Sequence, residues 1–197
     1  MNLPIIHIIG LPGAGKTTLA RRLNRNLKIP IYGIGAYRAR FPMTNIGEAD
    51  AWLALFRDLS KRKWRNCILE TTGLNIRESF LETSLPLGQM ITIKLGALRK
   101  KLYQRIDQKK KSERGGNWLY SAQYSDKYAF VRKLYKRFQE IPSDYYIDTS
   151  DLDKDEVYKI ALKEIKLIQQ AASDSSAGRS VNRLSSRLTK IPPDLSP

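Results

Sequence analysis

The sequence predicts a three-layer α/β fold, in which helices cover both faces of a parallel sheet. Short apolar segments rich in β-branched residues alternate with amphipathic segments of helical periodicity up to about residue 170. Strands and helices that alternate in this way form parallel sheets with right-handed crossovers. A chain of 197 residues with 42% hydrophobic residues also has enough apolar surface for one domain with a sizeable core.

Five segments have the length and composition of buried strands: residues 4–9, 29–34, 66–71, 89–95 and 144–148. Helices are expected over residues 17–27, 47–63, 76–83, 98–109, 124–141 and 153–170. Either Asp151 or Asp153 is suited to cap the last helix. We therefore expect one domain over residues 1–171, followed by a flexible tail of Ser, Arg and Pro over residues 172–197.

The composition excludes several classes of protein. The chain has 35 Lys and Arg against 19 Asp and Glu, and the formal charge of +16 fits nucleic acid, phosphorylated small molecules or a well-solvated surface. A single cysteine, Cys67, and a single histidine, His7, exclude an intrachain disulfide and a Cys/His zinc site. No apolar run reaches the roughly 20 residues that span a bilayer. Since the N-terminus also lacks the features of a secretory signal, we expect a cytoplasmic protein with no membrane partner.

The segment Gly10-Leu11-Pro12-Gly13-Ala14-Gly15-Lys16-Thr17 fits the phosphate-binding pattern G-x-x-x-x-G-K-[ST] and lies between an apolar strand and a helix. Glycines allow backbone N–H groups to surround phosphate oxygens, and the helix N-terminus adds a partial positive charge. We expect Lys16 to reach the β- and γ-phosphates and the Thr17 hydroxyl to bind Mg²⁺. The predicted ligand is therefore a nucleoside triphosphate with Mg²⁺, bound by Gly10, Gly13, Ala14, Gly15, Lys16, Thr17 and Thr18.

Two charged residues follow the second and third predicted strands, where ligands bind in open α/β sheets. Arg38, in Gly35-Ala36-Tyr37-Arg38, is suited to bind an acceptor phosphate, although a surface position beside Arg40 is the alternative. Glu70 ends an apolar strand, where an unpaired carboxylate is costly. Its possible roles are to hold an Mg²⁺-bound water, to accept a proton, or to serve only as a cap or ion-pair partner.

A basic stretch over residues 99–114 leads into a Gly-containing segment, which predicts a mobile basic lid at about residues 109–122. Arginines brought over a transferring phosphoryl group by a lid accelerate the transfer. Arg105, on the helix that leads to the lid, and Arg114, within it, are the candidates for this role.

These residues together resemble the P-loop kinase superfamily, which includes nucleoside monophosphate kinases and phage-type polynucleotide 5′-kinases. The resemblance covers roughly residues 4–168 and rests on the phosphate-binding loop, on residues 34–38, 70–75 and 146–149, and on the lid. It implies a P-loop NTPase fold with a five-stranded parallel sheet and transfer of the γ-phosphoryl group of ATP with Mg²⁺. By position, Arg38 matches the arginine that grips the acceptor-side phosphate, while Arg105 and Arg114 match lid arginines.

One departure from that pattern bears on the acceptor. Polynucleotide kinases carry an aspartate that deprotonates the 5′-hydroxyl where this chain has Gly35-Ala36. A hydroxyl acceptor benefits from a general base and an ionised phosphate does not, so a phosphate acceptor is favoured unless Glu70 supplies the base. We therefore expect a kinase for a small phosphate- or hydroxyl-bearing acceptor, in first place a nucleotide or nucleoside. A polynucleotide 5′-hydroxyl kinase, with nucleic acid as partner, and a non-catalytic nucleotide-binding regulator are the alternatives.

Overall fold

The sheet has five strands, as predicted. The computed structural model of the chain describes residues 3–42, 44–74, 85, 90–112 and 127–176. The strands are β1 (Ile5–Gly10), β2 (Ile31–Gly33), β3 (Cys67–Thr71), β4 (Met90–Gly96) and β5 (Tyr145–Asp148). Their order is β2-β3-β1-β4-β5 and every pair is parallel. Because parallel strands end at the same edge, the loops after β1, β2 and β3 meet at one side of the sheet.

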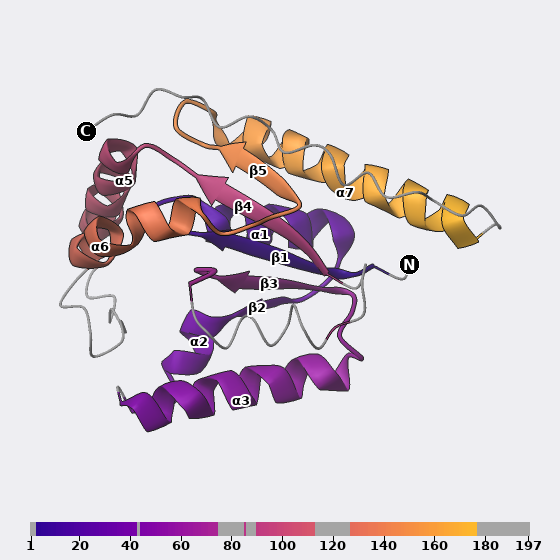
Figure 1. Cartoon of the computed structure of the whole chain (residues 1–197), viewed down its shortest axis with the longest axis horizontal. Helices are drawn as coiled ribbons and strands as arrows, with labels where there is room; N and C mark the ends of the chain where they lie inside the picture. Colours follow the sequence, from indigo (N-terminus) through magenta and orange to yellow (C-terminus); the bar gives the residue numbers. More distant parts are fainter. Residues whose placement is uncertain (1–2, 43, 75–84, 86–89, 113–126, 177–197) are drawn as a thin grey trace.

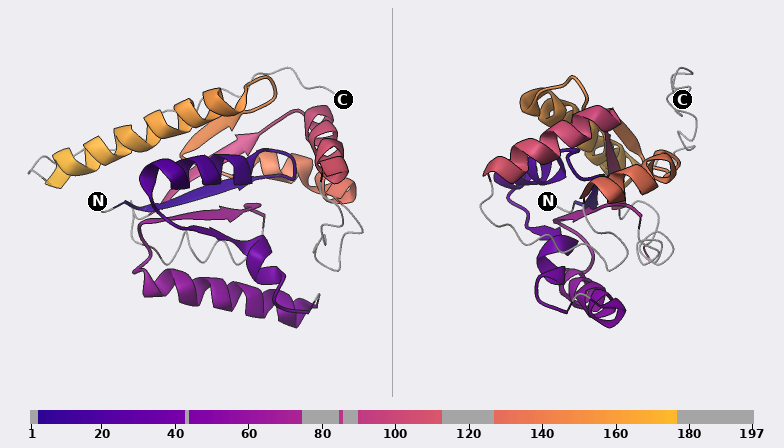
Figure 2. Two further views of the ribbon diagram at one scale, coloured as in Figure 1. Left: turned by 180° about the vertical axis from the view of Figure 1, so that it is seen from behind. Right: turned by 90° about the vertical axis from the view of Figure 1, so that its left-hand side faces the viewer.

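Helices cover both faces of the sheet, which confirms the three-layer prediction. Figures 1 and 2 show α1 on one face and α6 on the other, while α3 lies near β2 and α7 near β5. The helices are α1 (Lys16–Leu27), α2 (Ile34–Arg38), α3 (Asn45–Lys61), α5 (Arg99–Ser112), α6 (Lys127–Gln139) and α7 (Lys154–Ser176). One buried cluster joins the sheet to α1, α5, α6 and α7, and a second one, with Trp52 at its centre, joins it to α2 and α3. The apolar faces predicted from helical periodicity are therefore the buried ones.

The structure differs from the prediction after β2. Residues 29–34 were expected to form one strand, but β2 has only three residues, and its pairing with β3 ends at Gly33 opposite Glu70. The chain then enters α2, whose Ile34 and Tyr37 are buried against α3. The apolar pattern continues past the end of the strand, because Ile34 is buried as the first residue of α2, in a cluster that includes residues of α3 and of the sheet.

The last helix begins at an expected cap and ends later than expected. Asp153 caps α7, since its Oδ1 accepts hydrogen bonds from the backbone N–H groups of Asp155 (2.7 Å) and Glu156 (2.8 Å). Helix α7 continues to Ser176 and so extends past the boundary expected at residue 171. The predicted helix over residues 76–83, most of the lid, and the tail from residue 177 lie outside the described residues.

No helix among the described residues has both the length and the apolar character needed to cross a membrane.

Candidate active site

The two positive-φ glycines of the loop between β1 and α1 serve different physical needs. Gly13 has a φ of +85°, and a Cβ there would lie 2.7 Å from the carbonyl oxygen of Leu102 in α5. Gly15, with a φ of +96°, is the N-cap of α1, and a Cβ there would meet no atom within 4 Å. Gly13 is therefore required by the close approach of α5, whereas the backbone at Gly15 borders open space at a helix N-terminus. Such a position binds anions through backbone N–H groups.

The structure brings Thr17 and Glu70 into direct contact across 53 residues of sequence. The Thr17 hydroxyl donates to Glu70 Oε1 at 2.6 Å. The other oxygen, Oε2, would lie 3.7 Å from a Cβ on Gly33 at the end of β2. One oxygen of Glu70 therefore lies beside the phosphate-binding loop and the other beside the strand that precedes Arg38. Lys16 also lies in this loop, and its Nζ donates to the Leu11 carbonyl at 3.3 Å.

A hydroxyl and a carboxylate in contact are oxygen ligands of the kind that Mg²⁺ takes. Among the described residues there is no group of three or more His, Cys, Asp or Glu side chains that could hold a metal ion. One hydroxyl and one carboxylate fit Mg²⁺ in a nucleotide site, where water and phosphate oxygens complete the coordination. The predicted role of Thr17, with Glu70 behind it, is consistent with these contacts and stays a prediction.

Arg38 lines the same pocket but is paired within the protein. Its Nε and Nη2 donate to Glu48 Oε2 (2.7 Å) and Oε1 (2.6 Å), in a bidentate ion pair between α2 and α3. Glu48 Oε1 also accepts from Trp52 Nε1 at 2.9 Å. The alternative interpretation, a surface arginine beside Arg40, does not fit a side chain that is only 17% exposed. Its predicted contact with an acceptor phosphate stays a prediction.

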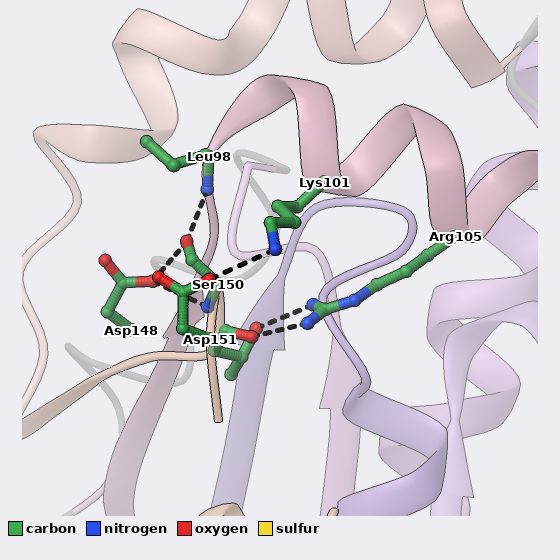
Figure 3. Close-up of polar contacts among 7 residues, drawn as sticks. Leu98, Lys101, Arg105, Asp148, Ser150 and Asp151 are labelled. Carbon is green, nitrogen blue, oxygen red and sulfur yellow. Dashed lines mark hydrogen bonds and ion pairs between the residues drawn. The ribbon is translucent and has the colours of Figure 1, made fainter. Parts of the chain in front are cut away.

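Arg105 lies on α5 and reaches to the loop after β5 (Figure 3). Its Nη1 donates to Thr149 Oγ1 at 2.9 Å and approaches the Gly13 carbonyl at 3.5 Å, and Nη2 donates to the Thr149 carbonyl. Arg105 thus joins α5, the phosphate-binding loop and the loop after β5. This placement differs from that of an arginine on a mobile lid, because the guanidinium is fixed by groups of the domain itself. Arg114, the other predicted lid arginine, lies outside the described residues.

The loop after β5 is tied to the start of α5 by Ser150 and Asp151 (Figure 3). Ser150 Oγ accepts from the Leu98 N–H at 2.8 Å and donates to Asp148 Oδ1 at 2.6 Å. Lys101 Nζ lies 3.1 Å from Asp151 Oδ1. These contacts hold the loop and α5 as one wall beside the phosphate-binding loop.

The phosphate-binding loop borders one pocket of about 1040 Å³, together with Arg38, Glu70, Arg105 and Thr149. We call the pocket-lining residues of β2, α2, the following Ala39 and the end of β3 the β2–β3 wall: Ile31, Gly33, Ile34, Gly35, Ala36, Arg38, Ala39, Glu70, Thr71 and Thr72. The α5–α7 wall consists of Arg105, Ile106, Thr149, Leu152, Asp153, Lys154 and Val157. The phosphate-binding loop lies between the two walls. The volume is at the upper end of the roughly 300–1,000 Å³ typical of a ligand pocket.

Sequence reasoning missed two residues behind the β2–β3 wall. His7 is buried in β1, and its Nε2 lies 2.8 Å from Thr71 Oγ1, while its Nδ1 has no hydrogen-bond partner among the described residues. Burial lowers the pKa of His7 to about 3, so the ring is neutral at physiological pH. Glu48 is the second. Glu48 lies in the first turn of a helix, where acidic residues are common, and its place in the sequence does not indicate a contact with Arg38. That pairing depends on how α2 and α3 pack.

The chain has the fold of the P-loop kinases. Shikimate kinase from Acinetobacter baumannii, solved in complex with shikimate, matches with a TM-score of 0.59 and 22% identity over 86% of this chain and 94% of that one. A gluconokinase from Sinorhizobium meliloti 1021 matches with a TM-score of 0.58 and 16% identity over 87% and 97%. The APS kinase of Mycobacterium tuberculosis, in complex with AMPPNP and APS, matches with a TM-score of 0.55 and 11% identity over 84% and 98%. No protein-family model and no curated protein matches the sequence.

Proposed function

We propose that the protein is a kinase that transfers the γ-phosphoryl group of ATP to a hydroxyl group of a small molecule. The observation that carries this proposal is the contact between Thr17 and Glu70 at 2.6 Å, in the middle of a pocket with two walls. It places a carboxylate where the phosphate-binding loop meets the β2–β3 wall. A carboxylate there serves both a bound triphosphate and an acceptor that lies against that wall.

In this proposal ATP lies along the phosphate-binding loop and the α5–α7 wall. The backbone N–H groups at the start of α1 and the Lys16 side chain bind its phosphate oxygens. Arg105 supports the loop from α5, since it contacts the Gly13 carbonyl and Thr149. The Thr17 hydroxyl and Glu70 would hold Mg²⁺, which neutralises charge on the β- and γ-phosphates when it is bound.

The proposed chemistry is a balanced transfer between two oxygens. The acceptor hydroxyl gives its proton to Glu70 and forms a bond to the γ-phosphorus. The bond between that phosphorus and the β,γ-bridging oxygen breaks, and ADP leaves with the electron pair. Glu70 Oε2 is suited to take the proton, because it lies beside Gly33 on the acceptor side of the loop. Glu70 therefore substitutes for the aspartate that Gly35-Ala36 lacks.

A hydroxyl acceptor is supported over the phosphate of a nucleotide by two observations. Arg38, the residue expected to grip an acceptor phosphate, is paired with Glu48. The structures with the same fold include a shikimate kinase and a gluconokinase, whose names give small hydroxyl compounds as acceptors. A nucleotide acceptor is therefore not favoured, and nothing in these comparisons supports nucleic acid.

The test is a phosphoryl-transfer panel with the full chain and Mg-ATP. Polyols, sugars, sugar acids, shikimate, nucleosides, nucleoside monophosphates and a 5′-hydroxyl oligonucleotide serve as acceptors, and ADP release and ³¹P NMR report transfer. We expect transfer to a small hydroxyl compound. Transfer only to the oligonucleotide or to a monophosphate would establish one of the other acceptor classes. Tight ATP binding without transfer to any member would indicate a non-catalytic regulator.

A further inference from the structure

Arg38 and Glu48 form an ion pair that cancels charge at the edge of the pocket. Both side chains are 17% exposed, and the two hydrogen bonds are 2.7 and 2.6 Å long. They use Nε and Nη2 of the guanidinium. The structure gives Nη1 no partner among the described residues. The pair thus carries no net charge but keeps N–H groups on a side chain that lines the pocket.

Glu48 is held in this position from the protein core. The indole N–H of Trp52 donates to its Oε1 at 2.9 Å, and Trp52 is only 1% exposed. Glu48 lies in the first turn of the 17-residue helix α3, whose N-terminus is capped by the Thr44 hydroxyl. A helix N-terminus stabilises a carboxylate in its first turn. Tyr37 of α2 also donates to Asp58 of α3 at 2.8 Å, so the two helices are fixed to each other.

The remaining charge on this side of the pocket is negative. Arg38 and Glu70 are the charged residues of the β2–β3 wall, and with Glu48 behind Arg38 their formal sum is −1. Arg21 of α1 also lines the pocket, but its side chain is exposed and water screens its charge. On the described part of this wall, a negatively charged acceptor would meet Glu70 and the γ-phosphate of ATP, and the one cation of the wall, Arg38, is paired with Glu48.

We propose that Glu48 determines the charge of the acceptor, so that the site selects an uncharged hydroxyl compound over an anionic one. In this arrangement Arg38 acts as a fixed hydrogen-bond donor to a hydroxyl oxygen and provides no net positive charge. The inference rests on the proposed kinase function and refines its acceptor class. The expected preference for a neutral acceptor distinguishes this pocket from those of kinases whose acceptors are anions such as shikimate and gluconate.

The experiment compares neutral and anionic acceptors in matched pairs. Methyl shikimate with shikimate and glucose with gluconate differ by one negative charge, and adenosine with AMP differs by nearly two. kcat/KM is measured for each with Mg-ATP. Binding is measured in parallel by calorimetry with AMPPNP in place of ATP, so that selectivity is read without turnover. In every pair with measurable binding or transfer, we expect the wild-type protein to favour the neutral member about tenfold or more, as a like-charge contact implies.

Three variants connect this preference to Glu48. Glu48→Gln keeps an oxygen for Trp52 but removes the charge, and should lower the preference for the neutral member about tenfold. The double variant Arg38→Gln/Glu48→Gln removes both charges, so it should bind acceptors more weakly while it keeps the preference for neutral ones. Asp50→Asn is the matched control, because it removes one charge from α3 at a residue with no described contact to Arg38. Thermal unfolding of each variant verifies that it folds. If Glu48→Gln does not fold, the double variant still tests the proposal.

The outcomes separate this proposal from the proposed function. Transfer to acceptors with a wild-type preference for the anionic members would overturn the role of Glu48 and leave the kinase function intact. An unchanged preference in Glu48→Gln, or an equal change in Asp50→Asn, would also overturn it. ATP binding with neither binding nor phosphorylation of any acceptor would count against the kinase function, and with it against this inference.

Discussion

Two arginines line opposite walls of one pocket, and the protein holds them in different ways. Arg105 on the α5–α7 wall donates to the hydroxyl and carbonyl of Thr149 and approaches the Gly13 carbonyl, all neutral oxygens. Arg38 on the β2–β3 wall donates to a carboxylate, Glu48. Neutral partners position a guanidinium without compensating its charge. A carboxylate at 2.6 Å cancels most of the electric field that the guanidinium would exert on a more distant ligand.

The comparison shows that a count of basic residues does not describe the field of a site. The chain carries a formal charge of +16, yet the β2–β3 wall with Glu48 has a formal sum of −1. The cations Lys16 and Arg105 lie at or beside the phosphate-binding loop, where a triphosphate needs them. The two sides of the pocket should therefore respond differently to mutation.

The largest effect is expected on the phosphate side, from Lys16→Ala. The variant loses the cation expected at the β- and γ-phosphates, so the turnover of ATP should fall on the order of 10²–10³-fold, with weaker ATP binding. Steady-state kinetics and calorimetry measure the two quantities. Arg25→Ala, an exposed residue on the same helix, is the control. Unchanged ATP binding in Lys16→Ala would refute the assignment of the phosphate-binding loop.

Glu70→Gln removes the carboxylate that lies between the two sides. If Glu70 accepts the proton of the acceptor, kcat should fall by roughly 10²–10⁴, while ATP binding changes by only a few-fold. Rapid-quench measurement of the chemical step, together with calorimetry for ATP, separates the two. Glu140→Gln serves as an exposed control. A variant whose kcat stays near that of the wild type would leave Glu70 without a role in proton transfer.

Arg105→Ala should affect the nucleotide side alone. Without Arg105, the phosphate-binding loop loses a contact with α5 and a cation beside the expected triphosphate. If this weakens ATP binding by about 1.4 kcal/mol, the KM for ATP should rise about tenfold. The preference among acceptors should stay unchanged, in contrast to Glu48→Gln. Lys100→Ala, which lies exposed on the same helix, is the control. If Arg105→Ala alters acceptor preference as strongly as ATP binding, the two walls are not independent.

The effect that is smallest at neutral pH concerns the stability of the fold, because it develops only in acid. The folded-state pKa of His7 is lowered to about 3 and its ordinary value is 6.5, so between these values the unfolded chain binds one more proton. Stability should therefore fall as pH decreases from about 6.5 towards 3, by at most about 1.4 kcal/mol per pH unit from this group.

Urea unfolding at several pH values measures this contribution. His7 is the only histidine of the chain, so His7→Gln should flatten the slope of the unfolding free energy between pH 6.5 and 5. Carboxylates titrate in both proteins, and their contribution cancels in the difference. Equal slopes in the wild type and the variant would contradict a neutral, buried His7.

Much of the fold could be predicted because its signals are local. The five strands follow from apolar periodicity, and the cap of the last helix follows from the acidic residue Asp153. The exception is Ile34, which belongs to an apolar run by sequence but turns into α2. The acceptor side was less predictable, since Arg38 came with two interpretations and neither included a carboxylate partner.

The sequence alone determined the phosphate-binding loop, because its requirements are met by neighbouring residues: glycines that adopt positive φ, a lysine and a hydroxyl at the start of a helix. Only the tertiary structure decided what surrounds that loop. It placed Glu70 on Thr17, Arg105 on Thr149 and Glu48 on Arg38, through contacts between separate elements. Electrostatic energy depends on distance and not on position along the chain, so the charge of each wall became known only when its partners were in place.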